Sequence, residues 1–440
     1  MSAEREAARR KKAASEGDVD RLSALPDGPL QTVLSFLPSR DAVRTSVLAS
    51  RWRNQWKSVP AVRITDVRRY QSADHLNSFV NYFLLFRGPL PVSEMEISGY
   101  DDEDTAAAFM FMEQWIRYGL SNGARVLHVR SNNINERWPL PDGLLISRQL
   151  VRLELIDLHV ETPILDFSSC HALEDLRMKH CAIKIGRIVS PSVMRLCITY
   201  CHFNSNDRTR ISFPCLTSLI LADCYDRTPV LESMPLLASA FIRLQTGLDC
   251  CGKKYETGDC GECHGCDGSY TGINSCILDG LSASKSLELT SPQTEFVFRK
   301  DLKCCPAFWK LKNLLLSEWC MTERLDALLC FIQHAPALEK LTLQFPKKPF
   351  EDIVDDGTIY DVSREPVALE HLTVEVKCHE VDEKISRILH LLECCGVPST
   401  KVNILSPPEL IQLQDTEGPV PSTSFSFEQK KALGAMSLDN

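Results

Sequence analysis

A short apolar pattern, L-x-x-L-x-L-x-x-C/N/L, recurs through most of the chain. Its clearest copies begin at Leu173 (LEDLRMKHC), Val193 (VMRLCITYC) and Leu216 (LTSLILADC). Weaker copies begin at Ala124, Leu150, Leu311, Leu338 and Leu369. Alternating apolar positions over so short a segment are typical of a β-strand with one buried face.

The fourth position of the pattern gives the repeat length. It is occupied in turn by Leu127, Leu153, Leu176, Leu196, Leu219, Ala240, Leu287, Leu314, Leu341 and Leu372. The intervals are 26, 23, 20, 23, 21, 47, 27, 27 and 31 residues. Leucine-rich repeats of roughly 20–29 residues each add a strand and a helix or turn to a curved solenoid. The longest interval therefore predicts a repeat with an insertion, and a further copy is expected around Met95 and Ile97.

Helical spacing appears between some of the predicted strands. Three stripes of apolar residues recur every three or four positions, as on the buried face of a helix. They are Phe109, Met112 and Ile116; Leu325, Leu328, Leu329 and Ile332; and Ile385, Ile388, Leu389 and Leu392, with Gly396 and Pro398 after the last. We expect helices there, on the outer side of the solenoid.

Residues 20–57 follow a helical pattern instead. Asp27 and Ser39 are expected to cap two helices separated by Pro38, and Ser50 to begin a third. The apolar positions are Leu30, Val33, Leu34 and Leu37, then Ala42, Val43, Val47 and Leu48, then Trp52 and Trp56. So short a helical unit buries too little apolar surface to be stable alone. It must pack on the rest of the chain or be completed by a partner.

The termini have a different composition from both segments. Residues 1–18 and 406–440 are polar and poor in bulky apolar side chains, which predicts disorder. The predicted fold is therefore α/β, with three small helices over residues 19–60 and a repeat solenoid over residues 61–405. The solenoid has short parallel strands, outer helices and a Cys/Gly-rich insertion at about residues 247–276.

Composition narrows the class of protein. With 58 acidic and 49 basic residues the net charge is −9, which does not favour nucleic-acid binding. Apolar stretches stay short of the ~18–20 residues of a membrane span, and MSAEREAARRKK is too polar for a secretory signal. Nineteen cysteines stay below the ~8–10% share of a disulfide scaffold. We expect a soluble protein of the nucleus or cytoplasm with reduced thiols; residues 9–12 (RRKK) are either a weak nuclear import signal or a solvated tail.

The sequence from Leu22 to Trp56 resembles a plant-type F-box. The similarity rests on LPD at residues 25–27, VLSFLP at 33–38, VRTSVL at 43–48 and RWR at 51–53. Pro29 departs from the pattern, because the family usually has an aliphatic residue there. An F-box followed by irregular leucine-rich repeats is similar to the plant F-box/LRR-repeat proteins, and residues 365–405 resemble the FBD segment that often ends them.

The resemblance implies a non-catalytic adaptor. In this family the F-box docks on the small Skp adaptor of a cullin–RING (SCF) ubiquitin ligase, and the repeats hold the protein to be ubiquitinated. The residues that would make or position the adaptor contacts are Leu25, Pro26, Leu30, Val33, Leu34, Leu37, Pro38, Val43, Val47, Leu48 and Trp52. For Trp52 and Trp56 an intramolecular role, anchoring the F-box to the solenoid, is an equal alternative.

Basic residues recur at strand positions that face the concave side of such a solenoid. They are Arg130, Arg152, Arg177, Lys179, Arg195 and Arg243, which we name the basic ladder. Guanidinium groups pair bidentately with carboxylates and phosphates, so the ladder would suit an acidic or phosphorylated segment of cargo. Interleaved acids such as Glu154 and Asp175 favour the alternative of a solvated face.

The longest interval contains the cysteine-rich sequence CCGKKYETGDCGECHGCDG. Cys260, Cys263 and Cys266 have C-x2-C-x2-C spacing, which suits thiolate ligands of zinc. The spacing matches neither a ferredoxin nor a zinc ribbon, and a surface loop of reduced thiols is the alternative. We therefore predict no cofactor, with zinc at these cysteines as the candidate to test.

The sequence contains no nucleophile elbow, P-loop, dinucleotide-binding glycine motif or H-E-x-x-H motif. Two hypotheses from different classes remain. The first is an SCF adaptor that binds a Skp-type protein and an unknown protein cargo, without a membrane or nucleic acid. The second is a leucine-rich-repeat scaffold outside any ligase, with zinc as a candidate ligand. Only the first requires a second protein at residues 20–57.

Overall fold

The computed structural model describes residues 22, 25–88, 90–100, 105–131, 137–141, 143–205, 208–244, 277–290, 298, 301–302, 305–317, 325–345 and 371–405. The chain forms two compact units, Met1–Arg137 and Trp138–Asn440. The two terminal segments predicted to be disordered and the cysteine-rich insertion lie outside the described residues.

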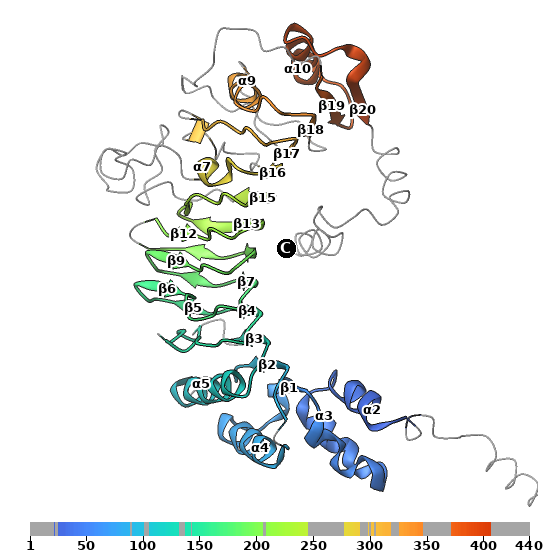
Figure 1. The fold of residues 1–440 in the computed structure, drawn as a ribbon, viewed down its shortest axis with the longest axis vertical. Helices are drawn as coiled ribbons and strands as arrows, with labels where there is room; N and C mark the ends of the chain where they lie inside the picture. Colours follow the sequence, from blue (N-terminus) through green and yellow to red (C-terminus); the bar gives the residue numbers. More distant parts are fainter. Residues whose placement is uncertain are drawn as a thin grey trace, which may run out of the picture. The chain divides into compact units, whose positions relative to one another are not determined.

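The first unit begins with short helices (Figure 1). They are α2 (Asp27–Leu34), α3 (Ser39–Arg44) and the 3₁₀ helices η1 (Thr45–Val47) and η2 (Ser50–Ser58). Pro26 and Pro38 occupy the N-caps of α2 and α3, and neither helix has a side-chain cap. The expectation that Asp27 and Ser39 act as caps was therefore wrong by one residue. Each proline has the extended ψ that an N-cap needs and lacks an N–H to satisfy.

Three parallel strands follow in the same unit. They are β1 (Ala61–Ile64), β2 (Glu94–Ser98) and β3 (Val126–Arg130). Val62 pairs with Met95, and Met95 pairs with Leu127. The additional repeat expected around Met95 and Ile97 is thereby confirmed, and β1 adds one more strand that the pattern did not predict.

Two helices connect these strands. A 3₁₀ turn, η3 (Val67–Arg69), precedes α4 (Ala73–Phe86), and α5 (Thr105–Ser121) joins β2 to β3. The side chain of Ser72 caps α4 by accepting the N–H of His75 at 3.2 Å. Helix α5 buries Met112 and Ile116, as their spacing predicts.

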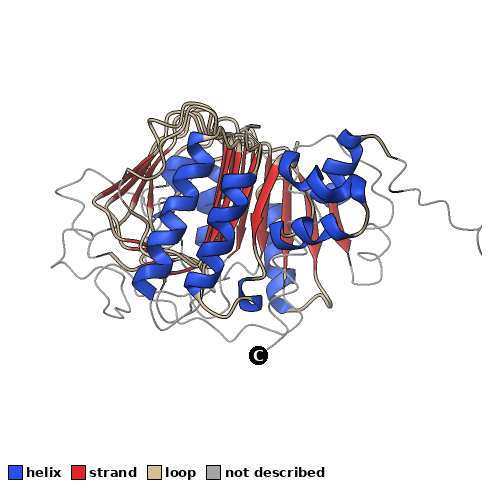
Figure 2. Ribbon diagram, turned by 90° about the horizontal axis from the view of Figure 1, so that it is seen from below, coloured by secondary structure: helices blue, strands red, loops and turns tan. Residues whose placement is uncertain are grey.

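In the second unit, ten described strands form one parallel sheet (Figures 1 and 2). They are β4 (Arg152–Ile156), β7 (Asp175–Lys179), β10 (Arg195–Thr199), β13 (Ser218–Asp226), β15 (Ser239–Leu244), β16 (Ser286–Thr290), β17 (Asn313–Ser317), β18 (Lys340–Gln344), β19 (Thr373–Lys377) and β20 (Val402–Leu405). The register aligns the fourth positions from Leu153 through Leu341, so the predicted repeat solenoid is confirmed. The last member was wrong: Val374, not Leu372, pairs with Leu341.

After each main strand the chain runs back to the start of the next one, and we name this segment the return side. Its secondary structure depends on the length of the repeat. The early repeats return through short strands: β5 (His159–Val160), β6 (Ile164–Asp166), β8 (Ala182–Ile183), β9 (Arg187–Val189), β11 (His202–Phe203), β12 (Arg210–Ser212) and β14 (Val230–Leu231). The later repeats carry helices: α7 (Leu278–Leu281), α9 (Asp326–Gln333), α10 (Glu383–Cys394) and η4 (Ser399–Lys401). Repeats of 20–23 residues leave no room for a helix beside the strand, whereas the longer repeats that contain α9 and α10, of 27 and 28 residues, do.

The core of the second unit lies between the main strands and the return side. Leucines such as Leu153 and Leu176 are fully buried there, with Phe167, Phe203 and Phe213 among the largest buried side chains. The other face of the main strands carries the intervening positions, which alternate with the buried leucines. We name it the open face.

A left-handed residue directly follows β4, β7 and β10, and another lies inside β13 where its register shifts. Asp157, His180, Tyr200 and Asp223 all have φ between 52° and 58°. The residue after the last three is a buried cysteine, Cys181, Cys201 or Cys224. Cys181 and Cys224 donate their thiols to carbonyls of the preceding repeat, Leu155 at 3.4 Å and Ile198 at 3.7 Å. These thiols act as small buried side chains that join neighbouring repeats.

Candidate protein-interaction sites

The helices before β1 have a small core of their own. Leu30, Leu34, Trp52 and Val59 form one buried cluster, with Leu37 and Ala49 packed against it. Leu30 and Leu34 are one helical turn apart on α2, so both point to the same side. Four buried residues are few, as expected for so short a unit, and neighbouring elements must complete it.

The second tryptophan supplies that support. Trp56 is buried and stacks on Phe83 of α4, with ring centroids 5.4 Å apart. Trp56 therefore packs the F-box helices against α4, whereas Trp52 packs among the F-box helices themselves. Their burial leaves other side chains to meet a partner.

Polar contacts hold the helices in place. The carboxylate of Asp27 pairs with Arg51 at 3.1 Å and accepts a hydrogen bond from Gln55 at 3.0 Å, joining α2 to η2. Arg63 on β1 donates to the carbonyl of Ser35 at 2.7 Å and pairs with Glu96 at 2.6 Å. The end of α2 is thereby tied to the strands of this unit.

Several large apolar side chains of these helices remain in solvent. Phe36, Val47 and Leu48 are 73%, 85% and 68% exposed, and Val33 is also exposed. Exposed apolar residues of this size, in two short stretches, make this part of the chain a candidate site of protein contact. We name these four residues the exposed docking face.

The residues predicted to serve adaptor binding divide into three groups. Leu30, Leu34 and Trp52 are buried; Leu25, Leu37, Pro38 and Val43 are half-buried; Pro26, Val33, Val47 and Leu48 are exposed. The first group can only position the others. Phe36 was missed because it lies in the turn after α2 and so falls outside the apolar stripe of that helix.

The open face brings part of the basic ladder together. Arg152, Arg177 and Arg195 all pair with Asp175, at 3.1, 3.2 and 3.7 Å. Asp175 is only 2% exposed, whereas each arginine keeps more than a third of its side chain in solvent. One buried carboxylate thus orients three guanidinium groups and neutralises part of their charge.

The other members of the ladder lie elsewhere. Arg243 forms an ion pair with Asp223, and Lys179 pairs in register with Ile156 and Thr199. Arg130 ends β3 in the first unit. The three arginines around Asp175 are therefore the part of the ladder that the structure gathers into one group.

The middle of the open face is apolar. Ile220, Ala222 and Phe241 form a buried cluster with Cys197, and the guanidinium of Arg243 lies 5.9 Å from the Phe241 ring centroid. Burial raises the pKa of the Cys197 thiol to about 11. Sequence reasoning missed this cluster; its signal is that LTSLILADC and SAFIRL have apolar residues at positions that are polar in other repeats.

Metal-binding residues were predicted only in the cysteine-rich insertion. Cys260, Cys263 and Cys266 lie outside the described residues. Among the residues that the structure does describe, Cys305, Cys330 and His334 have donor atoms close enough to share a metal ion. A search of the described helices finds none with the length and apolar character to cross a membrane.

The segment that contains the helices before β1 matches a known protein-family model. The family model of the F-box domain matches residues 22–63. The chain carries an F-box domain. This domain implies binding of a Skp1-type adaptor, and F-box proteins with leucine-rich repeats are typically substrate adaptors of SCF ligases and generally non-catalytic.

Plant F-box proteins are among the homologues. The meiotic F-box protein MOF of Oryza sativa subsp. japonica is 28% identical over 350 residues, 74% of this chain and 71% of the relative. Two F-box/FBD/LRR-repeat proteins of Arabidopsis thaliana also match. One is 32% identical over 39% of this chain and 38% of its own length. The other is 24% identical over 68% of this chain and 74% of its own length.

Proposed function

We propose that this chain is the substrate-recognition subunit of an SCF-type ubiquitin ligase. The observation that carries the proposal is the exposed docking face of the F-box. Burying a valine, leucine or phenylalanine side chain in a partner contributes about 1.5–3 kcal/mol each. The residues that position this face, Leu30, Leu34 and Trp52, are packed inside. The partner is a Skp-type adaptor, and through it a cullin–RING ligase.

The test is co-expression with a Skp1-type adaptor followed by size-exclusion chromatography. The wild-type chain is expected to co-elute with the adaptor, and Val47→Glu with Leu48→Glu to elute alone. Met110→Glu on α5 is the matched control, because Met110 is also an exposed apolar residue but lies outside the F-box. A second pair, Leu25→Ala with Pro26→Ala, is expected to abolish co-elution as well.

Each outcome has a distinct meaning once circular dichroism shows that the variants fold. A wild-type chain that elutes alone contradicts the ligase role and favours the leucine-rich-repeat scaffold. Co-elution of the Val47→Glu, Leu48→Glu variant would keep the adaptor role but reject the exposed docking face as its site.

The cargo is proposed to bind the open face of the second unit. Three half-exposed arginines held by Asp175 lie at one end of the early repeats, and the apolar cluster of Ile220 and Phe241 follows. Oriented guanidinium groups suit an acidic or phosphorylated segment. We therefore expect the ubiquitination of cargo, in the nucleus or the cytoplasm, to depend on this face.

A comparison of ubiquitinated proteins in cells tests the cargo site. Cells would express the wild-type chain, the Arg152→Glu, Arg195→Glu variant, or the Val47→Glu, Leu48→Glu variant. Ubiquitination of true cargo is expected to fall with both variants. Co-elution with the adaptor is expected to be lost only in the Val47→Glu, Leu48→Glu variant. Cargo ubiquitination that persists in the arginine variant would reject the open face as the cargo site.

A further inference from the structure

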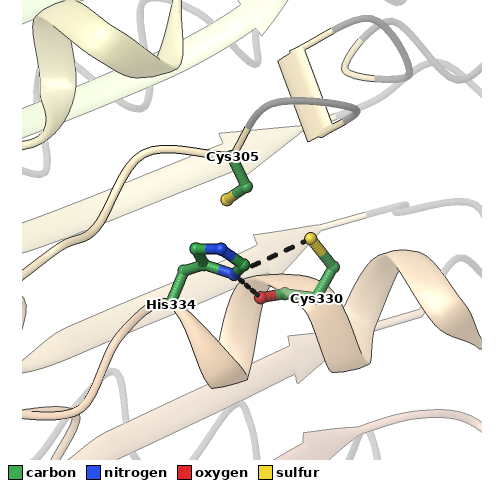
Figure 3. A group of neighbouring side chains, drawn as sticks. All are labelled: Cys305, Cys330 and His334. Carbon is green, nitrogen blue, oxygen red and sulfur yellow. Dashed lines mark hydrogen bonds between the residues drawn. The ribbon is translucent and has the colours of Figure 1, made fainter. Parts of the chain in front are cut away.

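Three metal-binding side chains of the second unit lie beside one another (Figure 3). The candidate ligand atoms of Cys305, Cys330 and His334 are all within 4.8 Å of each other. Cys330 and His334 are four residues apart, on α9 and at its C-cap, and Cys305 precedes β17. Both cysteines are buried, and the histidine is half-buried. The group shares no residue with the interaction faces.

The imidazole of His334 is already oriented. Its Nδ1 lies 2.8 Å from the backbone carbonyl oxygen of Cys330. A carbonyl oxygen only accepts hydrogen bonds, so Nδ1 carries the proton and Nε2 keeps its lone pair. In Figure 3 the ring edge that bears Nε2 faces Cys305. Metal-binding histidines are typically held in this way, with the other ring nitrogen donating to a backbone carbonyl.

The two thiols contact backbone carbonyls at distances typical of weak sulfur hydrogen bonds. Cys330 donates to the carbonyl of Leu302 at 3.6 Å, and its sulfur lies 3.9 Å from Nδ1 of His334. Cys305 contacts the carbonyl of Pro306 at 3.7 Å. Sulfur contacts at these distances cost little to exchange for metal bonds, which are far stronger.

We propose that Cys305, Cys330 and His334 bind one zinc ion. Tetrahedral zinc, with Zn–S bonds of about 2.3 Å and Zn–N bonds of about 2.0–2.1 Å, places its ligand atoms roughly 3.5–3.8 Å apart. Shifts of about 1 Å in the ligand atoms, produced by side-chain rotation, therefore bring this group into the geometry of a zinc site. Binding releases two protons, one from each thiol, and the two thiolates balance the charge of Zn²⁺. A water molecule fills the fourth position.

The ion would join two consecutive repeats. Cys305 belongs to the segment that leads into β17, whereas Cys330 and His334 belong to the helix before β18. The same junction contains stacked Phe308 and Phe331, with ring centroids 4.9 Å apart, and a 2.7 Å bond from the N–H of Phe308 to the carbonyl of His334. Zinc would fix this junction where the repeats are long.

Metal loading of the full-length chain tests the proposal. The protein is stripped with a chelator, reloaded with Zn²⁺ or Co²⁺, and its metal content measured by mass spectrometry. The variants are Cys330→Ala and His334→Ala. The matched control is Cys378→Ala, a buried thiol elsewhere in the same unit. A Cys260→Ser, Cys263→Ser, Cys266→Ser variant separates any metal held by the cysteine-rich insertion.

We expect one equivalent of metal to be lost in Cys330→Ala and His334→Ala but kept in Cys378→Ala and in the triple variant. The cobalt form should show a thiolate-to-cobalt charge-transfer band, which depends on Cys330. If Cys330→Ala fails to fold, the half-buried His334→Ala and the wild-type chain decide the matter. Chelation should lower the melting temperature of the wild type by several degrees, reversibly. Metal content unchanged in His334→Ala, or a melting temperature that chelation does not move, would overturn the site.

Discussion

At the scale of single residues, the open face is organised by a buried carboxylate. Asp175 is nearly inaccessible and pairs with three arginines from β4, β7 and β10. The sequence places Asp175 among the acids that weaken the basic ladder, but spacing alone does not reveal that one acid meets three bases. The parallel register does so, because it aligns Asp175 with Arg152 and Arg195.

Asp175→Asn is expected to destabilise the second unit. The neutral amide of asparagine cannot balance the charge of three guanidinium groups. The three arginines then repel one another across adjacent strands. Because the arginines are half-exposed, solvent compensates in part, and we expect a loss of about 2 kcal/mol. Urea denaturation of the variant measures it, with Glu339→Gln, an exposed acid of the same unit, as the control. A loss no larger than that of the control would mean that Asp175 does not organise the three strands.

The buried thiols make stability depend on pH. Burial raises the pKa of Cys224 to about 12 from its ordinary value of 9.0. Between these values the folded chain keeps the proton that the unfolded chain releases, so this contribution is complete below pH 9 and is lost as the pH rises toward 12. At pH 10 the loss is about 1.4 kcal/mol per such thiol.

Chemical denaturation at pH 8 and pH 10 tests this expectation. The wild-type chain should lose more stability between the two values than Cys224→Ala, which lacks the titrating thiol. Cys394→Ala, whose thiol is exposed, is the control and should behave as the wild type. Equal losses in wild type and Cys224→Ala would contradict the assignment.

At the scale of elements, the sequence predicted what has a regular pattern. Most main strands, the stripes of α5, α9 and α10 and the F-box helices follow from apolar spacing, whereas β1 and β20 were not predicted. Helix α4 did not, because Tyr82, Leu85 and Phe86 remain exposed beside its buried residues and obscure the stripe. The short return strands have two or three residues each, too few for a period of two to be visible.

At this scale, Trp56 packs the F-box helices against helix α4. Trp56→Ala removes a buried indole that stacks on Phe83, and such truncations cost about 3–5 kcal/mol. We expect a lower melting temperature for the first unit and, as a consequence, weaker adaptor binding. Tyr82→Ala, an exposed aromatic on α4, is the matched control and should change stability by about 0.5 kcal/mol or less.

Phe83→Ala closes a double-mutant cycle with Trp56→Ala. If the two losses of stability simply add, the ring contact does not couple the F-box to α4, and the anchoring role fails. A coupling of about 0.5–1.5 kcal/mol would agree with a stacked aromatic pair.

At the scale of the whole molecule, the two proposed interaction surfaces fall in different compact units. The F-box and its exposed docking face belong to the first unit, and the open face with its arginines belongs to the second. The change in periodicity near residue 60 predicts this division only in part. The boundary lies later in the chain, because β1, β2 and β3 fall in the same unit as the F-box. Repeat spacing shows where strands form, whereas compactness depends on contacts that spacing does not encode.

Hydrogen exchange in the presence of a Skp1-type adaptor tests whether the adaptor binds the first unit. A ligand that binds only the folded F-box stabilises it by an amount that grows with ligand concentration. At saturating adaptor we expect slower exchange of the amides in α2, α3, η1 and η2, because docking suppresses their local opening. Exchange in β7, β10 and β13 should stay as it is in the free chain. The Val47→Glu, Leu48→Glu variant is the control and should show no protection anywhere. Protection that appears first in the strands around Asp175 would contradict the assignment, since the open face, rather than the F-box, would then hold the adaptor.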